Sequence, residues 1–129
     1  MKIDHIAIWT HDLEKTKKFY LKYFGAKCSD KYINIEKNFS SYFLSFEEGN
    51  TRMELMHNPY IMEFLGNHAS SLGLTHLSIS VGDRKRVDKL TEQLRSDGYN
   101  IVSEARITGD GYYESVIEDS EWNRIEITE

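Results

Sequence analysis

Successive residues alternate in character along two segments of the chain, residues 3–9 and 74–81. In the second segment the two alternating sets are Leu74, His76, Ser78 and Ser80 on one side and Thr75, Leu77, Ile79 and Val81 on the other. Successive side chains of a β-strand point to opposite faces of the sheet, so a period of two indicates a strand with one covered face. We therefore predict two half-buried strands, 71 residues apart.

A helix is predicted after each of these strands. Asp12 and Asp83 follow the strands at the same offset, and an aspartate in this place accepts hydrogen bonds from the free N–H groups of a helix. Stripes of largely apolar residues come next, formed by Leu13, Thr16, Tyr20, Tyr23 and Phe24 in the first helix and by Val87, Leu90, Thr91 and Leu94 in the second. We expect Gly25 and Gly98 to end the helices, because glycine adopts the left-handed C-terminal conformation without a side-chain penalty.

Strand-like runs complete each half of the chain. Three runs follow each helix, at 26–36, 39–48 and 51–57 and again at 99–107, 112–119 and 124–128. The closing runs repeat a motif, because Arg-Met-Glu-Leu at 52–55 returns as Arg-Ile-Glu-Ile at 124–127. Internal repetition of this kind predicts two βαβββ units.

The repeats divide the chain into residues 1–57 and 73–129. The linker between them, 58–72, holds the only proline, Pro59, and a short segment of helical character at 61–65. The expected fold is a single α+β domain over residues 1–129, in which the two repeats form curved mixed sheets.

Four polar side chains stand at corresponding places in the repeats: His5 and His76 in the opening strands, Glu54 and Glu126 in the closing strands. The apolar positions must cover the helices, so we expect these four on the opposite face, in the concavity of the curved sheets. Taken singly, each is better explained as a solvated polar residue. Their joint placement favours a site for a divalent metal ion, because imidazole and carboxylate ligands suit Mn, Fe, Ni, Co or Zn.

Further residues are candidates for a pocket around this site. An ion with four protein ligands keeps positions for water or substrate, which is typical of catalytic sites. Arg52 and Arg124 share the inward parity and either hold an anionic substrate or pair with the ligand carboxylates. Trp9 and Trp122 either line an aromatic pocket or fill gaps in the core. Tyr113, beside a glycine-rich turn, either forms part of a lip or belongs to an ordinary hairpin.

Composition and charge narrow the classes of partner. The net charge is −5 and the basic residues are scattered, so we expect no nucleic-acid partner. The chain has no apolar run of about 20 residues and no continuously apolar N-terminus, so we expect a soluble, cytoplasmic protein without a membrane partner. Cys28 is the only cysteine, which excludes an internal disulfide and a multi-cysteine zinc site. His11, His57 and His68 lack the repeat symmetry and are interpreted as surface or loop histidines.

These residues resemble the vicinal oxygen chelate superfamily, which includes glyoxalase I, fosfomycin-resistance thiol transferases, methylmalonyl-CoA epimerase and bleomycin-binding proteins. The resemblance covers the whole chain and is carried by His5-Ile-Ala-Ile, the helix from Asp12-Leu13 to Phe24-Gly25, Met53-Glu54-Leu55, Gly73-Leu74-Thr75-His76-Leu77 and Asn123-Arg124-Ile125-Glu126. It implies the glyoxalase/bleomycin resistance/dihydroxybiphenyl dioxygenase fold. In the glyoxalase I branch it implies metal ligands in the order His, Glu, His and Glu, as found here.

The resemblance also implies an assembly and an activity. The implied assembly is a homodimer in which His5 and Glu54 of one subunit meet His76 and Glu126 of the partner subunit. Other family members form the site within one chain. The implied activity is that of a metal-dependent lyase or isomerase of the glyoxalase I (lactoylglutathione lyase) type, acting on a small substrate with vicinal oxygens. Glu126 is the first choice for moving the proton and Glu54 the second.

Two departures from the family pattern and two alternative functions remain. Trp9 stands where glyoxalase I usually has an arginine that grips glutathione, and Trp122 replaces the glycine of an Asp-Pro-x-Gly-Asn turn, so this turn must differ or carry strain. A fosfomycin-type thiol transferase would use His5, His76 and Glu126 alone. A non-enzymatic, bleomycin-resistance-like binder would use the concavity without chemistry.

Overall fold

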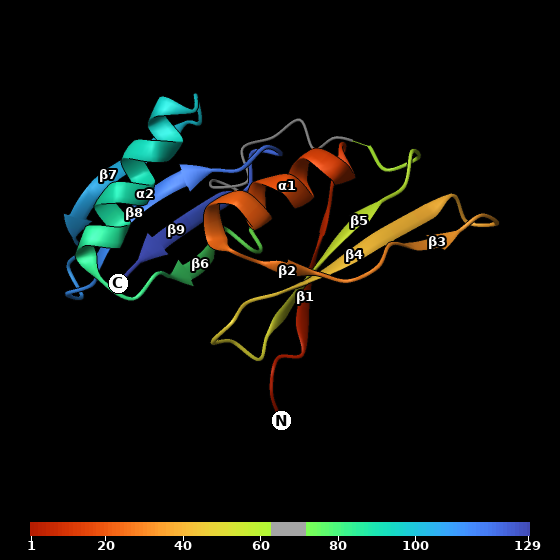
Figure 1. Ribbon diagram of the computed structural model, residues 1–129, viewed down its shortest axis with the longest axis horizontal. Coiled ribbons are helices and arrows are strands. Elements are labelled where there is room, and N and C mark those ends of the chain that lie inside the picture. The colour runs from red at the N-terminus through yellow and green to blue at the C-terminus, as the bar shows by residue number, and fades with distance from the viewer. Residues whose placement is uncertain (63–71) are drawn as a thin grey trace. The chain divides into compact units, whose positions relative to one another are not determined.

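The computed structural model describes residues 1–62 and 72–129, which form two compact units that divide near residue 64 (Figure 1). The predicted linker, 58–72, spans this division. Its residues 63–71, with most of the helical segment expected at 61–65, lie outside the described residues. The two units have the α+β composition that the repeats predict.

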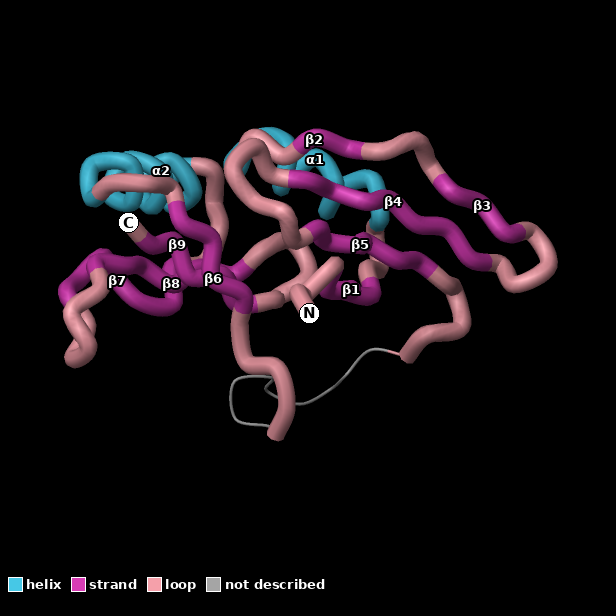
Figure 2. Tube along the Cα trace, turned by 90° about the horizontal axis from the view of Figure 1, so that it is seen from below, coloured by secondary structure: helices cyan, strands magenta, loops and turns pink. Residues whose placement is uncertain are grey.

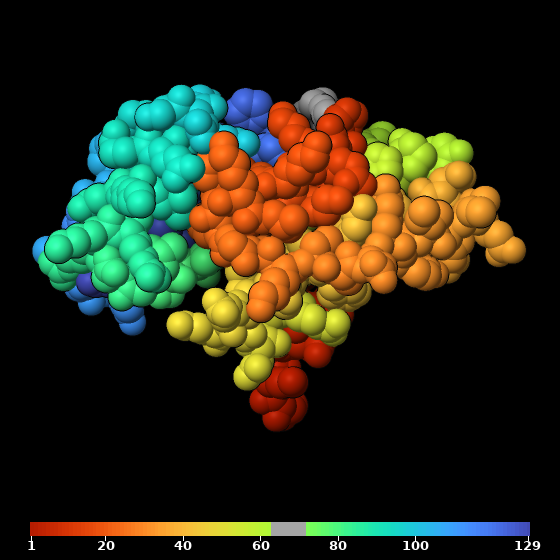
Figure 3. All heavy atoms as spheres, in the orientation of Figure 1, coloured from red at the N-terminus to blue at the C-terminus, as the bar shows by residue number. Residues whose placement is uncertain are grey.

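Unit 1 is a five-stranded sheet with one helix. Its elements are β1 (His5–Trp9), α1 (Leu13–Phe24), β2 (Lys27–Cys28), β3 (Tyr32–Asn34), β4 (Phe39–Ser45) and β5 (Arg52–His57). The strand order is β1-β5-β4-β2, and β3 also pairs with β4. β1 runs parallel to β5, and the other pairs are antiparallel. Part of α1 lies at the surface of this unit, in orange-red in Figure 3.

The continuous strand predicted at 26–36 is wrong, because two short strands, β2 and β3, take its place. Ser29 lies at the break. Its hydroxyl accepts a hydrogen bond from the N–H of Phe43 at 3.0 Å. A backbone carbonyl would accept from this N–H if the strand continued, so the serine side chain interrupts the ladder.

Unit 2 follows the predicted βαβββ order. Its elements are β6 (Leu77–Ser80), α2 (Arg84–Ser96), β7 (Ile101–Ile107), β8 (Tyr113–Glu118) and β9 (Arg124–Thr128). The strand order is β6-β9-β8-β7, with β6 parallel to β9. Figure 2 shows α2 on one side of this sheet. No helix in the described part of the chain has the length and apolar character needed to cross a membrane.

The aspartates that were expected to begin the helices do so. Asp12 accepts a hydrogen bond from the N–H of Lys15, and Asp83 accepts one from the N–H of Arg86, both at 2.9 Å. Each carboxylate thereby satisfies a backbone donor that has no partner within its helix. The repeat thus extends to the start of both helices.

The helix ends differ between the units. Gly25 ends α1 in the left-handed conformation, with φ of 62°, as predicted. The prediction that Gly98 ends α2 is wrong by one residue, because the C-cap is Asp97, with φ of −84°. Gly98 follows with φ of 88°, and the N–H of Tyr99 donates to the carbonyl of Leu94 at 3.0 Å. The left-handed turn is therefore kept, one residue later than expected.

Each helix covers an apolar core on one face of its own sheet. The buried apolar residues of unit 1 are Leu13, Phe19, Tyr20, Ala26, Tyr42, Leu44, Met53 and Leu55, and those of unit 2 are Val87, Leu94, Ile117, Ile125 and Ile127. Unit 2 also buries two hydroxyl groups, those of Thr91 and Ser115, which bond to each other at 2.7 Å. The pairing satisfies both hydroxyls, which would be costly to bury alone.

The turn that leads into β9 is held by a buried carboxylate. Asp119 is 4% exposed, and its Oδ1 accepts hydrogen bonds from the N–H groups of Glu121 at 2.8 Å and Asn123 at 2.9 Å. Between them Trp122 has φ of 65°, a left-handed conformation that disfavours any residue with a Cβ atom. Of the two outcomes expected for this turn, the structure shows the strained one.

Replacing Trp122 with glycine is expected to stabilise the protein. Glycine adopts the left-handed conformation without the Cβ clash, so the substitution removes about 1–2 kcal/mol of strain. Glycine also gives the unfolded chain more conformational freedom, which offsets about 0.4–1 kcal/mol of this gain. Urea denaturation should show a net gain of roughly 0.5–1 kcal/mol for Trp122→Gly. Trp122→Ala is the control, because alanine keeps the Cβ atom and the strain. Equal stabilities of the two variants would contradict this account of the turn.

Candidate metal-binding site

In unit 1 the pairing of β1 with β5 places the predicted ligands on one face of the sheet. Ala7 is the partner of Glu54, and His5 lies two residues before Ala7 on the same side. Met53 and Leu55, on either side of Glu54, are buried beneath α1 at 2% and 0% exposure. Glu54 therefore faces away from the helix, as the alternation predicts.

His5 and Glu54 approach each other on this face. Nε2 of His5 lies 4.0 Å from Oε2 of Glu54, and the two side chains are 40% and 16% exposed. The imidazole is partly open to solvent while the carboxylate is largely covered. An ion-binding pair needs this combination of access and confinement.

Unit 2 repeats the arrangement with the same register. Ser78 is the partner of Glu126, and His76 lies two residues before Ser78. Nε2 of His76 lies 3.3 Å from Oε1 of Glu126, with exposures of 43% and 19%. Ile125 and Ile127 are fully buried on the opposite side of β9.

The two pairs fit the donor set of a divalent ion. Two atoms that each lie about 2.1 Å from one ion are separated by no more than about 4.2 Å, and both pairs meet that limit. Within the described residues no group of three or more His, Cys, Asp or Glu side chains is placed to hold one metal ion. The structure thus brings the four predicted ligands together two by two, and metal binding by them stays a prediction.

Each histidine has a further partner that sequence patterns did not reveal. The side chain of the preceding residue lies beside Nδ1 in both units: Oδ2 of Asp4 is 3.0 Å from Nδ1 of His5, and Oγ1 of Thr75 is 3.1 Å from Nδ1 of His76. In each histidine the other ring nitrogen, Nε2, faces the glutamate. The strands were expected to begin at residues 3 and 74, but β1 begins at His5 and β6 at Leu77, so Asp4 and Thr75 precede them and the expected alternation does not hold there.

The arginines on this face are engaged differently from expectation. Arg52 does not pair with a ligand carboxylate: its Nη2 atom lies 2.6 Å from Oδ2 of Asp4, and its guanidinium lies 4.4 Å from the centre of the Phe43 ring. Arg124 occupies the corresponding place in β9, where it is the backbone partner of Glu118. Hydrogen bonds from His5 and Arg52 lower the pKa of Asp4 to about 2, so this carboxylate is ionised.

The two tryptophans do not fill the core. Trp9 is 44% exposed and contacts the edge of Phe39, with ring centres 6.1 Å apart. Trp122 is 71% exposed at the turn before β9. The core-filling interpretation is therefore wrong, and Trp9 lies on the same face of its sheet as Glu54.

Tyr113 lies on the other face of unit 2, which corrects its expected place at the pocket. Its hydroxyl donates to Oδ1 of Asp88 in α2 at 2.6 Å, a bond that raises the pKa of the tyrosine, and Arg84 lies over its ring. Tyr113 shares its parity in β8 with the buried residues Ser115 and Ile117, a signal that was present in the sequence. The glycine-rich turn before it is a hairpin turn between β7 and β8.

Glu114, which sequence reasoning missed, shares the face of Glu126. It pairs with Thr128 in β9, two residues from Glu126, and its side chain is 13% exposed. Burial, followed by the negative charge of Glu126, raises the pKa of Glu114. The ligand face of unit 2 therefore carries a carboxylate besides Glu126, and this carboxylate lies 4.0 Å from Nη2 of Arg106.

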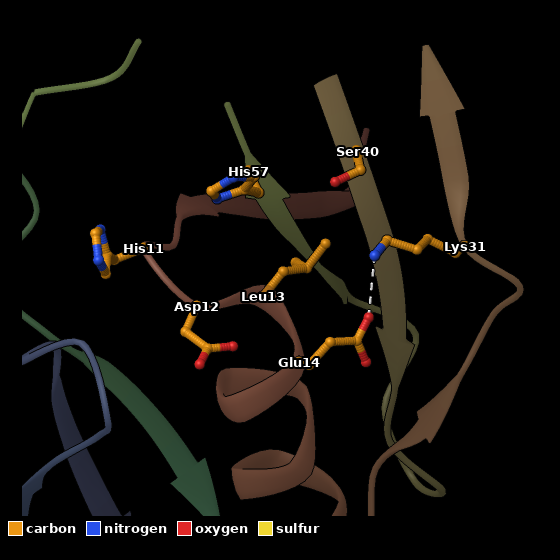
Figure 4. A pocket seen from close by; sticks show the side chains of 7 residues that line it. All are labelled: His11, Asp12, Leu13, Glu14, Lys31, Ser40 and His57. Carbon is orange, nitrogen blue, oxygen red and sulfur yellow. Dashed lines mark hydrogen bonds and ion pairs between the residues drawn. The ribbon is translucent and has the colours of Figure 1, made fainter. Parts of the chain in front are cut away.

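A pocket of about 320 Å³ lies on the opposite face of unit 1, away from the ligand pair (Figure 4). It is lined by His11, Asp12, Leu13, Glu14, Lys31, Ser40 and His57. His57 donates through Nδ1 to the carbonyl of Thr10 at 3.0 Å, so it belongs to this rim of the sheet. His68 lies outside the described residues.

Glu14 is the charged centre of this region. Its carboxylate accepts hydrogen bonds from Lys17, from Lys31 at 3.1 Å and from the Tyr42 hydroxyl at 2.9 Å. These contacts, that of Lys17 first, lower the pKa of Glu14 from 4.5 to about 2. The cluster ties α1 to β4 and to the loop before β3.

Comparison with known proteins gives a match over nearly the whole chain. Residues 2–127 match the family described as the Glyoxalase/Bleomycin resistance protein/Dioxygenase superfamily. A lactoylglutathione lyase from Arabidopsis thaliana is 29% identical over 126 residues, which is 95% of this chain and 42% of the plant protein. Human mitochondrial methylmalonyl-CoA epimerase is 30% identical over 107 residues, or 73% of this chain and 59% of the human protein. The chain thus spans only part of the length of these two relatives.

A solved structure shows the same fold. It is the glyoxalase family protein from Enterococcus faecalis, with a TM-score of 0.79, 22% identity, and coverage of 99% of this chain and 97% of that one. This structural similarity confirms the predicted α+β fold with two curved sheets.

Removing the Glu14 carboxylate should flatten the acid dependence of stability. Because the folded-state pKa is depressed, the contribution of Glu14 is present above its ordinary pKa of 4.5 and is lost as pH falls toward 2. Its side chain is 45% exposed, so solvent screening keeps the effect below about 1 kcal/mol. Denaturation of Glu14→Gln between pH 6 and about pH 3 should show a shallower loss of stability than wild type or Glu47→Gln, a change at an exposed turn. Parallel pH curves for all three proteins would refute the role of this cluster.

Proposed function

The chain belongs to the Glyoxalase/Bleomycin resistance protein/Dioxygenase superfamily, and from this premise we propose that it is a divalent-metal-dependent lyase or isomerase of the glyoxalase I type. Its substrate is a small molecule with two adjacent oxygen atoms. The match to a lactoylglutathione lyase supports the reaction class. The match to an epimerase supports a related step, in which a proton is removed from a carbon beside a carbonyl group and a proton is then returned to carbon.

The observation that carries the proposal is the repeated His–Glu pair. Units of different sequence place a histidine Nε2 and a glutamate carboxylate 4.0 Å and 3.3 Å apart, in the same register and opposite the helix. Solvated polar residues on an open sheet face have no reason to keep this arrangement twice. Shared coordination gives such a reason.

His5, Glu54, His76 and Glu126 are the residues that would hold the ion. When bound, a divalent ion supplies Lewis-acid stabilisation of negative charge on a substrate oxygen. Four ligands require both pairs, contributed either by one chain or by two copies in a homodimer. Nickel, zinc, iron, manganese and cobalt all accept this ligand set.

Glu126 is assigned the proton transfer, with Glu54 as the second choice. A carboxylate oxygen on this face can take the proton from one carbon and return it to the next, provided that it reaches the substrate at hydrogen-bond distance. Glu126 is 19% exposed, so it is confined but accessible. Glu54 is similarly confined, at 16%.

The substrate is proposed to lack the usual glutathione contact. Trp9 occupies the place where an arginine would grip the tripeptide, and it presents an aromatic edge-to-face pair with Phe39 instead. Arg52, the nearest arginine in register, is neutralised by Asp4. This face therefore suits a thiol adduct or oxo compound with an uncharged, apolar substituent.

A fosfomycin-type thiol transferase is the alternative, and one observation favours it. The His5–Glu54 separation of 4.0 Å is longer than the His76–Glu126 separation of 3.3 Å. The Glu54 carboxylate is thus farther from its histidine than the Glu126 carboxylate is from His76. A ligand set of His5, His76 and Glu126 would leave Glu54 free for another role.

Metal content of purified variants tests the proposal. Wild type should bind one divalent ion per chain, and Glu126→Gln and His5→Ala should weaken binding by at least about 100-fold, because even the partners of ligands contribute roughly 10–100-fold. Glu118→Gln is the matched control, since it removes a carboxylate of the neighbouring strand β8 from the sheet face that carries Glu126. Elemental analysis and titration of the metal give the answer. Glu54→Gln separates the alternatives, because unchanged affinity would favour the thiol transferase.

Turnover is measured on the same proteins with a hemithioacetal isomerisation assay. Metal-loaded wild type should convert an adduct with an aryl substituent faster than the glutathione adduct of methylglyoxal, and Glu126→Gln should convert neither. Protein that carries no ion and gains none on titration would favour the non-enzymatic binder. Bound metal without turnover would reject the glyoxalase assignment and keep the site.

A further inference from the structure

His5 is enclosed by a ring of contacts that has no counterpart around His76. Nδ1 of His5 lies 3.0 Å from Oδ2 of Asp4, and the same oxygen lies 2.6 Å from Nη2 of Arg52. Arg52 lies over the Phe43 ring at 4.4 Å, and that ring contacts His5 at right angles, with ring centres 5.4 Å apart. The contacts close on themselves around the imidazole.

The backbone fixes the members of this ring. His5 and Arg52 are direct partners in the parallel pairing of β1 with β5, and the N–H of Arg52 donates to the carbonyl of Asp4 at 3.0 Å. Phe43 is the partner of Glu54 on the next strand, β4. The ring therefore spans three strands and includes the neighbour of the predicted ligand carboxylate.

The chemistry of Asp4 determines which nitrogen of His5 carries the proton. Oδ2 of Asp4 accepts a hydrogen bond from Nη2 of Arg52 at 2.6 Å, and a carboxylate paired with a guanidinium group is ionised and can only accept. Nδ1 must then be the donor. Nε2 is left with its lone pair, and this is the atom that faces Glu54.

Unit 2 lacks the carboxylate and the phenylalanine of this ring of contacts, although Arg124 occupies the place of Arg52. Thr75 lies beside Nδ1 of His76 at 3.1 Å, but a hydroxyl can donate as well as accept and does not select a tautomer. Val116, the partner of Glu126, stands where unit 1 has Phe43. The two repeats share a backbone arrangement, so the difference belongs to the side chains and not to the fold.

We propose that Asp4 and Arg52 are positioning residues for His5, which hold its imidazole in the Nδ1–H form with Nε2 directed outward as a metal ligand. The ion in this statement rests on the proposed function, whereas the tautomer does not. Partners of metal-bound histidines commonly act in this way, by orienting the ring and making it a stronger ligand. Arg52 is accordingly part of the ligand support and not a binding group for an anionic substrate.

Stability alone does not account for this arrangement. The side chains of Asp4 and Arg52 are 56% and 43% exposed, and exposed ion pairs contribute little to folding. Their effect should therefore appear in the state of His5 and in its affinity for a metal, and hardly in the denaturation curve. That separates a positioning role from a structural one.

The first experiment reads the tautomer in metal-free protein by ¹⁵N–¹H NMR of the histidine rings above their titration range. Wild-type His5 should be in the Nδ1–H form, and Asp4→Asn and Arg52→Gln should shift it toward the Nε2–H form that free histidine prefers. His57, whose Nδ1 donates to a backbone carbonyl, is the internal control for folding and should not change. An Nε2–H tautomer in wild type, or no change in Asp4→Asn, would overturn the proposal.

The second experiment measures affinity for Ni²⁺ or Zn²⁺ in competition with a chelator. Asp4→Asn and Arg52→Gln should weaken binding about 10–100-fold. Glu104→Gln is the matched control, because Glu104 forms an exposed pair with Arg95 at the same 2.6 Å separation, and its change should leave the affinity within about twofold. Equal affinities of Asp4→Asn and Glu104→Gln would overturn the positioning role. Absence of metal binding in wild type would reject the proposed function, and the NMR result would still decide the state of His5.

Discussion

The parallel pairing of the first strand with the last in each unit is the constraint on which the rest of the structure depends. β1 pairs with β5, and β6 pairs with β9, in the same register. Because side chains alternate between the faces of a strand, this register sends the neighbours of each glutamate under the helix and the glutamate to the other face. A shift by one residue in either strand would bury the carboxylate and expose the core. Core packing therefore also places the site.

Features that depend on local periodicity or on capping were readable from the sequence. Asp12 and Asp83 begin their helices, and Glu54 and Glu126 take the faces that alternation predicts. Helix capping and strand alternation depend on residues a few positions apart in the sequence, so both can be predicted without knowledge of the tertiary structure. The split into β2 and β3 was not readable, because it depends on the Ser29 hydroxyl reaching a backbone donor in β4.

Side-chain partnerships show the same division. Tyr113 shares the parity of Ile117, so its place beneath α2 could have been predicted and was missed by attending to the neighbouring glycines. Asp4 and Thr75 lie inside the predicted strands but before the observed ones, so the directions that alternation gave them do not apply. The Asp4–Arg52 contact joins residues 48 positions apart, and its identification needed the register of β1 against β5.

The two units keep one geometry and differ in their chemistry. Unit 1 surrounds its histidine with a carboxylate, an arginine and a phenylalanine, whereas unit 2 offers a hydroxyl and places an additional carboxylate, Glu114, on its ligand face. A repeated sheet thus supplies matching ligand pairs in unlike surroundings. On the proposed function, unit 1 orients its histidine through a carboxylate and an arginine, and unit 2 adds a carboxylate to the face that carries Glu126.

X-ray absorption at the metal edge, on protein loaded with nickel or zinc, tests the central claim most directly. If both His–Glu pairs serve one ion, saturation requires one ion per chain, and the spectrum contains the scattering of two imidazoles and of carboxylate oxygens about 2.0–2.2 Å from the metal. Saturation at two ions per chain with a single imidazole on each would contradict it, because each pair would then bind its own ion.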